Sequence, residues 1–502
     1  MIPGPPDQTL SPEWQARAGG LKLPAYGIVE GEKRNARSGL SFPCTNPATR
    51  EKLADVAAFQ EEDVDAAVHS ARSAFESGCW SGAAPGERKA RMIAFAGLIL
   101  EHRAELALMD SLSMGKPAQV AYESDVPGAA AFIRWYGECL DKLYDELVPS
   151  DGSSLVTATR EPLGVVALIT PWNYPTEEAA IKLGPALAAG NSVILKPSEL
   201  SPFSAIRLAE LALEAGIPSG VLNVAPGPGE CTGRALALNP DVDCVSFTGS
   251  TEVGKLLMRY SGQSNLKRVW LECGGKSPNL VFADCPDVGR AAAESARSVF
   301  RNQGQVCSAA TRVLVEEEIA DSFAGRLVGA AADYRPADPL LSSSRVGALA
   351  SLEQYEKVLD YIEIGLAEGA ELLLDGRSID RPGSGFFLGP TIFGKVRPDM
   401  RIAREEIFGP VLCLMTFRDE AEAIRLANDS IYGLVASLWT SDLSRAHRVS
   451  RRLAAGSVTV NGMDSQNEAA PFGGYKQSGI GREHSLRAFD LYTNSKTTWI
   501  HY

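Results

Sequence analysis

Residues 192–216 read SVILKPSELSPFSAIRLAELALEAG, and this stretch decides the predicted fold. Its first part, Ser192–Leu195, is a short apolar run that predicts a buried strand. Ser201-Pro202 then predicts the cap and first turn of a helix, which Gly216 ends. The helix carries a polar stripe made by Arg207, Glu210 and Glu214. The stretch is therefore one strand–helix unit of a doubly wound parallel sheet.

The same succession of strand, turn and helix recurs along the chain. Around the first unit lie three more apolar runs: Val165–Ile169, Val221–Val224 and Cys244–Phe247. A second series begins after about Gly275, with the runs Asn279–Phe282, Arg312–Val315, Val411–Phe417 and Ser457–Val460. Continuous apolar strands that alternate with helices indicate parallel sheets covered on both faces. The predicted fold class is α/β, and because no long linker separates the two series, we expect them to pack around a cleft.

The two ends of the chain lie outside these series. Residues 1–45 are rich in Pro and Gly and predict an irregular arm, whereas residues 61–144 are helical in pattern, as in Asp63–Phe75 and Glu87–Arg103. The β-prone tail Lys496–Ile500 has two possible partners, the strand-like stretch Leu155–Arg160 or another subunit. We favour an oligomer, because an unpaired strand edge promotes association.

The composition is that of an ordinary globular protein, with 45% hydrophobic and 22% charged residues among 502. The net charge of -13 argues against a nucleic-acid surface and leaves room for an acidic site that attracts cations. No apolar run approaches the roughly 20 residues that span a bilayer, and the start MIPGPPDQTL lacks the features of a secretory signal. Nine scattered cysteines without metal-ligand spacing predict reduced thiols in the cytoplasm and no metal site.

Two glycine-rich loops follow predicted strands. In Phe247–Gly254, glycines would let the backbone approach a pyrophosphate, and the N–H groups of a helix start would bind it. The second loop is Gly227-Pro228-Gly229 followed by Gly233. Neither loop reads G-x-G-x-x-G, and each taken alone is more often a turn. Lys196-Pro197-Ser198-Glu199, at the carboxyl end of a strand, suits ribose hydroxyls about as well as it suits a solvated charge pair.

Two further segments carry candidate catalytic groups. Glu272 precedes Cys273-Gly274-Gly275, so a tight turn could present its carboxylate to a cleft, although an exposed Glu is the usual case. In Pro171-Trp172-Asn173-Tyr174-Pro175, two prolines clamp an Asn between aromatic rings, which generic packing does not explain. A rigid Asn amide is the kind of donor that stabilises an oxyanion.

Taken together, these segments resemble the aldehyde dehydrogenase superfamily over nearly the whole chain. They are PWNYP (171–175), KPSE (196–199), FTGSTEVG (247–254), LECGGKSP (271–278), GQVCSA (304–309), EEIFGPV (405–411) and PFGGYKQSGIGR (471–482). Each is weak alone, but the ordered set is specific. The resemblance implies a Rossmann-like dinucleotide-binding domain (1–146 and 163–274), a catalytic α/β domain (275–476) and an oligomerisation β-flap (147–162 and 485–502) that builds a homodimer or homotetramer.

The resemblance also implies roles for single residues. Cys307 is expected to attack the aldehyde carbon, Asn173 to form the oxyanion hole with the Cys307 N–H, and Glu272 to activate the water that hydrolyses the thioester. Lys182 is expected among the catalytic residues. The residues expected to hold the cofactor are Trp172, Lys196, Ser198, Glu199, Gly229, Phe247, Gly249, Ser250, Glu406 and Phe408. Glu199 favours NAD, because a carboxylate repels a 2′-phosphate, while the nearby Lys196 keeps NADP possible.

Within the superfamily, the closest resemblance is to the gamma-glutamyl-gamma-aminobutyraldehyde and guanidinobutyraldehyde dehydrogenases of polyamine catabolism. It rests on stretches such as Lys267–Glu272 and Ser444–Asn461. The expected substrate tunnel departs from that group, since Glu178 replaces an apolar residue and Ile181 replaces an indole. The residues expected to face the substrate are Asp125, Tyr174, Glu178, Asp464 and Phe472.

An acidic tunnel favours a cationic tail, so we expect an omega-amino- or guanidino-aldehyde. The alternative is that these carboxylates point to solvent or pair with Lys182 or Arg134, which leaves a general aliphatic or semialdehyde dehydrogenase. An inactive relative would have lost Cys307, Asn173 or Glu272, and all three are present. An enzyme that transfers the acyl group to CoA or phosphate would not need Glu272. Cys273, where the family commonly has Leu or Ala, is expected to be a packing residue rather than a redox-sensitive one.

Overall fold

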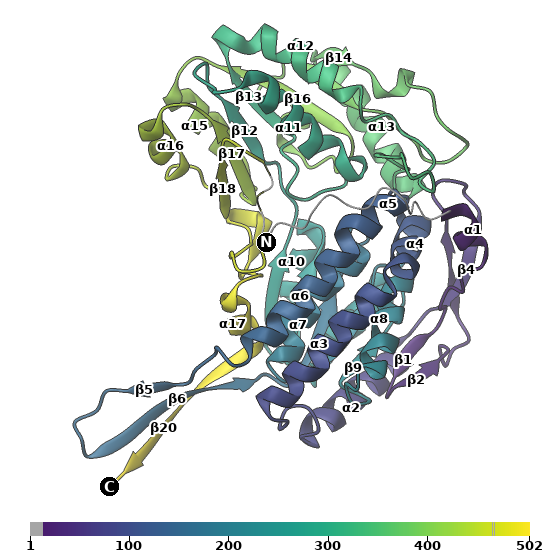
Figure 1. Ribbon diagram of the computed structural model, residues 1–502, viewed down its shortest axis with the longest axis vertical. Helices are drawn as coiled ribbons and strands as arrows, with labels where there is room; N and C mark the ends of the chain where they lie inside the picture. The colour runs from purple at the N-terminus through teal and green to yellow at the C-terminus, as the bar shows by residue number, and fades with distance from the viewer. Residues whose placement is uncertain (1–13, 464, 466) are drawn as a thin grey trace.

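The computed structural model describes residues 14–463, 465 and 467–502 (Figure 1). Asp464, one of the expected substrate residues, lies outside the described residues. None of the helices that the described residues form has the length and apolar character of a membrane span.

The first predicted series forms a sheet with a parallel centre. Its five parallel strands are β7 (Val165–Ile169), β8 (Ser192–Lys196), β9 (Leu222–Val224), β10 (Cys244–Thr248) and β11 (Arg268–Glu272). Alternate strand residues pack on opposite helical layers, because neighbouring side chains of a strand point to opposite faces. One layer, facing the viewer in Figure 1, contains α3 (Pro85–Glu101), α6 (Val126–Cys139), α7 (Pro175–Ala188) and α8 (Phe203–Glu214). The other layer contains α2 (Glu61–Glu76), α9 (Arg234–Leu238) and α10 (Thr251–Gln263). The doubly wound sheet predicted from residues 192–216 is confirmed.

The strand order of this sheet reverses beside β7. The strands lie in the order β11-β10-β7-β8-β9, so the chain runs outward from β7 to β9 and then returns to β10 on the other side of β7. Ligands of open α/β sheets bind outside the carboxyl ends of the strands at such a reversal. The segment 171–175 follows β7 and the segment 249–250 follows β10, so both predicted motifs lie at this position.

The second predicted series forms another sheet. Its parallel strands are β12 (Pro278–Val281), β13 (Arg312–Glu316), β15 (Thr391–Gly394), β16 (Val411–Phe417), β17 (Val435–Trp439) and β18 (Ser457–Val460), with β14 (Glu371–Leu374) antiparallel at one edge. Helices α11 (Val288–Phe300) and α12 (Ala320–Ala331) cover one face. Helices α13 (Leu352–Ala367), α15 (Glu420–Asn428) and α16 (Leu443–Ser450) cover the other. The sequence prediction missed β15 and β17, and in β17 Ser437 interrupts the apolar run.

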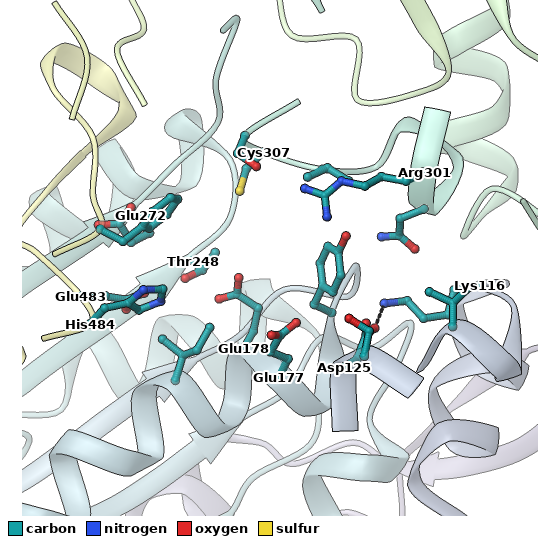
Figure 2. Close-up of a pocket in the computed structure, with 18 of the residues that line it drawn as sticks. Lys116, Asp125, Glu177, Glu178, Thr248, Glu272, Arg301, Cys307, Glu483 and His484 are labelled. Atoms are coloured by element: carbon teal, nitrogen blue, oxygen red, sulfur yellow. Dashed lines mark hydrogen bonds and ion pairs between the residues drawn. The ribbon is translucent and has the colours of Figure 1, made fainter. Parts of the chain in front are cut away.

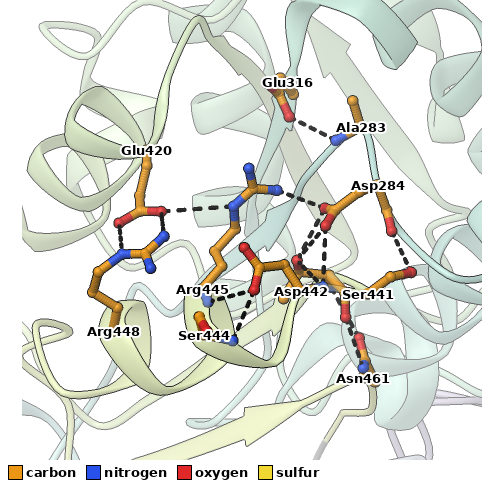
Figure 3. Close-up of polar contacts among 11 residues, drawn as sticks. Ala283, Asp284, Glu316, Glu420, Ser441, Asp442, Ser444, Arg445, Arg448 and Asn461 are labelled. Carbon is orange, nitrogen blue, oxygen red and sulfur yellow. Dashed lines mark hydrogen bonds and ion pairs between the residues drawn. The ribbon is translucent and has the colours of Figure 1, made fainter.

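Charged side chains fasten the helices of the second sheet to its strand ends (Figure 3). The Asp284 carboxylate, just beyond β12, accepts hydrogen bonds from Thr440 Oγ1 at 2.8 and 3.0 Å and from Arg445 Nη1 at 2.7 Å. Glu420, at the start of α15, accepts two bonds from Arg448 of α16 at 2.8 and 2.6 Å. These paired groups hold α15 and α16 against the sheet, away from the cavities described below.

The C-terminal tail pairs within its own chain. Strand β20 (Thr493–His501) runs antiparallel to β6 (Ser154–Pro162) along its whole length, and β5 (Glu146–Val148) completes a three-stranded sheet. Of the two partners considered from the sequence, the intrachain one is therefore the one observed. Figure 1 shows that this sheet projects from the body of the protein. It leaves Leu147, Trp499 and Ile500 more than half exposed, at 71%, 59% and 51%.

Two expectations about local structure were wrong. The segment expected to be an irregular arm contains α1 (Trp14–Gly19) and the short strands β1 (Gly27–Val29), β2 (Glu32–Arg34) and β3 (Ser41–Thr45). Strands β1 and β2 extend the edge of the first sheet beside β9, and they are too short to show a period between the turn residues. Ser201 does not cap α8: Pro202 is the N-cap residue and no side chain makes the cap bond.

Candidate active site

Cys307 lies in the loop between α11 and β13, and the backbone before it has an unusual conformation. The turn η3 (Arg301–Gly304) holds two residues in the left-handed region, with φ of 48° and 58°. The amide oxygens of Gln303 and Gln305 each accept a backbone N–H from the segment 347–350 at 3.0 Å. Strained backbone held by buried side chains is typical of functional sites. This loop presents the half-buried Cys307 thiol before β13.

A cavity of about 230 Å³ opens beside Cys307, and we call it the acidic cavity. A single water occupies about 30 Å³, so the cavity has room for a small organic molecule. It is lined by five carboxylates, those of Asp125, Glu177, Glu178, Glu272 and Glu483. Figure 2 shows Glu177 and Glu178 entering it from α7, across from Cys307 and Arg301.

A second cavity, of about 180 Å³, lies on the other side of the same cysteine. Its walls include Trp172, Asn173, Gly249, Ser250, Gln354, Lys357, Glu406 and Phe408. The two cavities share four lining residues: Thr248, Glu272, Cys273 and Cys307. The thiol and the Glu272 carboxylate are therefore accessible from two separate spaces, as a reaction between two bound molecules requires.

Hydrogen bonds fix the walls of the second cavity. The Glu406 carboxylate accepts the N–H of Gly275 at 3.0 Å, and Gln354 Nε2 donates to the Phe408 carbonyl at 2.7 Å. The Phe408 ring meets Trp172 edge to face, with the ring centroids 5.3 Å apart. Ser250 caps α10, accepting the N–H of Val253 at 3.2 Å, so the start of this helix faces the cavity.

The Glu272 carboxylate is buried, and neither of its oxygens has a hydrogen-bond partner among the described residues. Burial raises the pKa of Glu272 well above its usual value, and the charges of Glu483 and Glu178 raise it further. A carboxylate with a raised pKa is a stronger base than an exposed one. The surroundings of Glu272 therefore suit proton transfer near neutral pH.

The Cys307 thiol is in a similar environment. Burial raises its pKa well above the usual value, and the charges of Glu178, Glu406 and Glu272 act in the same direction. The Arg301 guanidinium opposes them. The resting cysteine is therefore a neutral thiol, and nucleophilic attack requires that its proton be removed.

Four of the expected substrate residues, Asp125 among them, line the acidic cavity together with Glu177, which was not among those expected. Tyr174, Glu178 and Phe472 lie in its wall, and Glu177 joins them. Burial raises the pKa of Glu178 to about 7 and that of Glu177 to about 8, with neighbouring carboxylates adding to the effect. The alternative that Glu178 pairs with Lys182 or Arg134 does not hold in the structure, since Lys182 pairs with Glu483 and Arg134 with Glu138.

Asp125 lies in the cavity wall but already has a partner. It is 2% exposed and forms an ion pair with Lys116, whose ammonium also sits 3.8 Å above the centre of the Tyr174 ring. An aspartate neutralised in this way is not available to a cationic ligand. Asp125 therefore stays a predicted substrate residue, but its charge is already paired with Lys116, a contact that the sequence did not reveal.

Lys182 and Asn173 lie beside the site with different contacts. The Lys182 ammonium is fully buried and bonds Glu483 at 2.5 Å and Ser246 Oγ at 3.2 Å, so it faces the back of the acidic cavity rather than its interior. Asn173 Nδ2 donates to the Gln305 carbonyl at 2.9 Å, which holds the amide against the Cys307 loop. An amide nitrogen has a second N–H to offer a ligand.

Only some of the residues expected to bind the cofactor line the second cavity. Five line the second cavity: Trp172, Gly249, Ser250, Glu406 and Phe408. Lys196 is the last residue of β8, Ser198 and Glu199 follow it, and Lys196 Nζ lies 3.3 Å from the Glu199 carboxylate. Phe247 is instead 5% exposed in the core, with its ring packed against Gly249. Gly229 begins an exposed turn that lines neither cavity, as the turn interpretation of that loop predicted.

Several lining residues were not singled out from the sequence. Gln354 and Lys357 come from α13, and Lys116 and Arg301 lie outside the quoted motifs. Of these four residues, only Arg301 could have been found from the sequence, because it directly precedes the segment that contains Cys307. Cys273, by contrast, packs where expected: its sulfur lies 3.0 Å from the position that a side chain on Gly254 would occupy.

Comparisons with known proteins agree with this geometry. A profile described as "Aldehyde dehydrogenase family" matches residues 34–498. The NADP/NAD-dependent aldehyde dehydrogenase PuuC of Escherichia coli is 50% identical, over 97% of this chain and 98% of that protein. A variant of the indole-3-acetaldehyde dehydrogenase AldA of P. syringae, solved with NAD+ and IAA, is 52% identical with a TM-score of 0.96, over 97% of this chain and 99% of that one. The gamma-glutamyl-gamma-aminobutyraldehyde dehydrogenase of Burkholderia cenocepacia is 51% identical with a TM-score of 0.95 and the same coverage.

Proposed function

The chain belongs to the aldehyde dehydrogenase family, and on that premise we propose that it oxidises an aldehyde with a cationic tail to the carboxylic acid, with NAD as the second substrate. The observation that carries the proposal is that Cys307, Glu272, Glu177 and Glu178 line one cavity. The tail is that of an omega-amino- or guanidino-aldehyde. The similar Burkholderia cenocepacia enzyme, whose name specifies an aminobutyraldehyde derivative, supports this substrate class.

In the proposed reaction, the Cys307 thiol loses its proton to solvent, and the sulfur attacks the aldehyde carbon and gives a thiohemiacetal alkoxide. The second N–H of the Asn173 amide and the Cys307 backbone N–H donate to that oxygen. Oxidation leaves a thioester on Cys307. Glu272, with its raised pKa, then takes a proton from water, and the resulting hydroxide releases the acid and restores the thiol.

The second cavity suits NAD, which would supply the hydride acceptor for the oxidation of the aldehyde carbon. The N–H groups at the start of α10, capped by Ser250, suit a pyrophosphate. Glu199, with its side chain 45% exposed, suits a ribose diol, and Glu406 a second ribose. Trp172 and Phe408 provide apolar walls for the nicotinamide. The carboxylate of Glu199 favours NAD over NADP.

Lys182 is proposed to act through Glu483. Its buried ammonium neutralises Glu483, which faces the acidic cavity and raises the pKa of Glu272. Loss of Lys182 would leave Glu483 as an uncompensated buried charge and would raise the pKa of Glu272 further. We therefore propose Lys182 as a positioning residue for the catalytic base.

The assembly proposed is a homodimer or homotetramer. The projecting sheet of β5, β6 and β20 exposes Leu147, Trp499 and Ile500, which would be buried by a second copy. The nine cysteines are all free thiols, which supports a reducing compartment such as the cytoplasm.

A panel of aldehydes under saturating NAD, with no CoA or phosphate present, tests the proposal. We expect free acid to accumulate and kcat/KM to be higher for derivatives of 4-aminobutanal than for hexanal or benzaldehyde. Equal or better kcat/KM for hexanal or benzaldehyde would disprove the cationic preference. A requirement for CoA or phosphate would disprove the hydrolytic second step.

A further inference from the structure

The Cys307 thiol needs a group that accepts its proton. Burial and the nearby carboxylates keep the resting sulfur as a neutral thiol, whereas attack on an aldehyde requires that the proton leave. The acidic cavity measures about 230 Å³, so an aldehyde in it displaces water from beside the sulfur. The acceptor that stands between the thiol and solvent is therefore a group of the cavity wall. Arg301 is not a candidate, because a guanidinium stays protonated.

Two of the five carboxylates in the wall already have partners. Asp125 pairs with Lys116, and Glu483 pairs with Lys182 behind the wall. A carboxylate in a buried ion pair is a weak base, because its protonation would leave the cationic partner uncompensated. These two carboxylates are therefore poor acceptors for the thiol proton.

His484 and Glu272 are unsuitable for different reasons. The centre of the His484 ring lies 4.6 and 5.4 Å from the centres of two phenylalanine rings, and burial lowers its pKa, so it is a weaker base than an exposed imidazole. Glu272 has to stay ionised for the water of the second step. The carboxylates of the wall that remain are Glu177 and Glu178.

Glu178 lies toward the thiol, and Glu177 lies away from it. Among the charged groups that raise the pKa of Cys307, Glu178 has the largest effect, whereas the charge with the largest effect on the pKa of Glu177 is that of Asp125. Figure 2 shows the same arrangement, with Glu178 between Thr248 and Glu177, and Glu177 on the side of Asp125. The Oε2 atom of Glu178 is buried and has no hydrogen-bond partner among the described residues. A buried acceptor without a donor is stabilised when a proton is delivered to it.

Hydrogen bonds fix the position of Glu178 relative to the thiol. Glu178 lies in the first turn of α7. The segment just before this helix is tied to the loop that carries the thiol, because Asn173 Nδ2 donates to the Gln305 carbonyl at 2.9 Å and Asn302 Nδ2 donates to the Asn173 carbonyl at 3.0 Å. A base and a nucleophile on segments that are bound to each other satisfy the positional requirement for proton transfer.

We infer that the Glu178 carboxylate accepts the proton of the Cys307 thiol as the sulfur attacks the aldehyde, and later passes it to solvent. The S–H bond breaks as the S–C bond forms, the proton moves to Glu178, and the carbonyl electron pair moves onto the alkoxide oxygen. A proton lost directly to solvent would leave the sulfur and Glu178 both negative in a buried space, whereas the transfer leaves one negative charge. The inference rests on the proposed function, because it names the acceptor in its first step, and it holds for aldehydes with or without a charged tail.

A single turnover with a neutral aldehyde tests the inference, because no charged tail then contributes to the result. Enzyme in excess over hexanal is mixed with saturating NAD, and the formation of NADH is followed by its absorbance. In Glu178→Gln we expect the rate at neutral pH to fall about 10²-fold or more, the usual contribution of a general base. A carboxylate that acted only as a nearby charge would give the opposite result, since its removal would lower the pKa of Cys307 and speed the attack. Glu138→Gln is the matched control, because Glu138 pairs with Arg134 on the surface of α6 and lines neither cavity.

The pH dependence and a second variant separate a base from a group that only shapes the cavity. Burial raises the pKa of Glu178 to about 7, Glu483 adds to the effect, and Lys182 and Lys116 oppose it. The wild-type rate of NADH formation should therefore rise around pH 7 and then level off, whereas in Glu178→Gln it should continue to rise with pH. Glu178→Ala should be as slow as Glu178→Gln, but acetate, which supplies the atoms that this substitution removes, should speed it about tenfold or more. Chloride at the same ionic strength should have no effect.

The inference fails on either of two results. If Glu178→Gln forms NADH as fast as the wild type or faster, Glu178 is only a nearby charge. If Glu178→Gln is slow but keeps the wild-type pH dependence, and acetate does not speed Glu178→Ala, the side chain only maintains the shape of the cavity. The proposed oxidation and its cationic preference stand in both cases, since the wild-type enzyme still forms the acid. A wild-type enzyme that forms no NADH from any aldehyde would instead disprove the proposed function itself.

Discussion

The two cavities on either side of Cys307 are built in different ways. The walls of the second cavity come from backbone turns at strand ends: Gly249 and Ser250 after β10, and Glu406 held by the Gly275 N–H. The acidic cavity is built from side chains of helices, above all Glu177 and Glu178 of α7, and its character depends on which side chains these are. The second cavity is therefore specified by the conformation of the chain, and the acidic cavity by the identity of its side chains.

Substitutions should therefore act differently in the two cavities. On the backbone-built side, adding a single methyl group should displace a ligand-binding group, even where no charge changes. On the side-chain-built side, an amide in place of a carboxylate should change specificity while leaving the shape of the cavity nearly intact. Both kinds of change should leave the shared wall, with Cys307 and Glu272, in place.

The largest effect is expected at the shared wall. Cys307→Ser should lower kcat for every aldehyde by about 10⁴-fold or more, because a hydroxyl in this acidic setting is a far weaker nucleophile than a thiol. Tryptophan fluorescence quenching should show that NAD still binds. Cys285→Ser is the control, since Cys285 lies beyond β12 and lines neither cavity; a similar loss there would contradict the assignment.

Glu272→Gln should separate the two halves of the reaction. We expect one rapid burst of NADH per active site followed by turnover that is about 10²- to 10⁴-fold slower, because Glu272 is assigned as the base of the hydrolytic step. Rapid-mixing absorbance at 340 nm measures both phases. A burst that disappears together with steady turnover would show that Glu272 acts before the thioester forms.

Gly274→Ala probes the backbone-built side. A side chain at Gly274 would lie 2.1 Å from the Glu406 carboxylate, so Glu406 must move off the Gly275 N–H. We expect the KM for NAD to rise about tenfold, since misplacing a binding group by about 1 Å is costly. Initial rates over a range of NAD concentrations measure it. Gly262→Ala is the control, because α10 leaves space there; equal effects of the two changes would refute this explanation.

The pH dependence probes the side-chain-built side. The pKa of Glu178 is raised to about 7 and that of Glu177 to about 8, so both become negatively charged as the pH rises from 6 to 9. The ratio of kcat/KM for a cationic aldehyde to that for a neutral aldehyde of equal length should therefore rise about three- to tenfold over this range. Taking the ratio cancels the titration of Cys307 and Glu272. In Glu178→Gln the rise should start at higher pH; an unchanged profile would exclude Glu178.

The smallest effect is expected on stability. A carboxyl whose folded pKa is raised favours the folded state below its unfolded pKa, and that contribution is lost as the pH rises through the folded pKa. Glu177→Gln removes this loss, so its Tm should exceed the wild-type Tm by roughly 1–3 °C at pH 9 and by less at pH 5. Thermal unfolding at both pH values measures it, with the exposed Glu76→Gln as control. A Tm difference that is the same at both pH values would argue against the raised pKa.

Most of the fold could be predicted from the sequence, because long apolar strands and capped helices carry their own periodicity. The strands Val411–Phe417 and Ser457–Val460 have the predicted bounds, whereas β1, which has three residues, and β17, which Ser437 interrupts, were not recognised. The contacts within the site were harder to predict from the sequence than the strands were. The motif residues that follow β7 and β10 lie where strand order directs them, but the pairing of Lys116 with Asp125 joins residues whose contact no local pattern specifies. Glu177 is not predicted as a substrate residue for the same reason, because only the packing of α7 against Gly128 turns it into the cavity.

We propose above all that the aldehyde becomes a thioester on Cys307, between the two cavities. The most direct measurement is peptide mapping by mass spectrometry of Glu272→Gln, quenched in acid after one turnover with NAD and a cationic aldehyde. We predict an added acyl mass on the peptide that contains Cys307 and on no peptide of the other eight cysteines. An acyl mass on a different cysteine, or a full burst of NADH with no acyl mass at all, would contradict the claim.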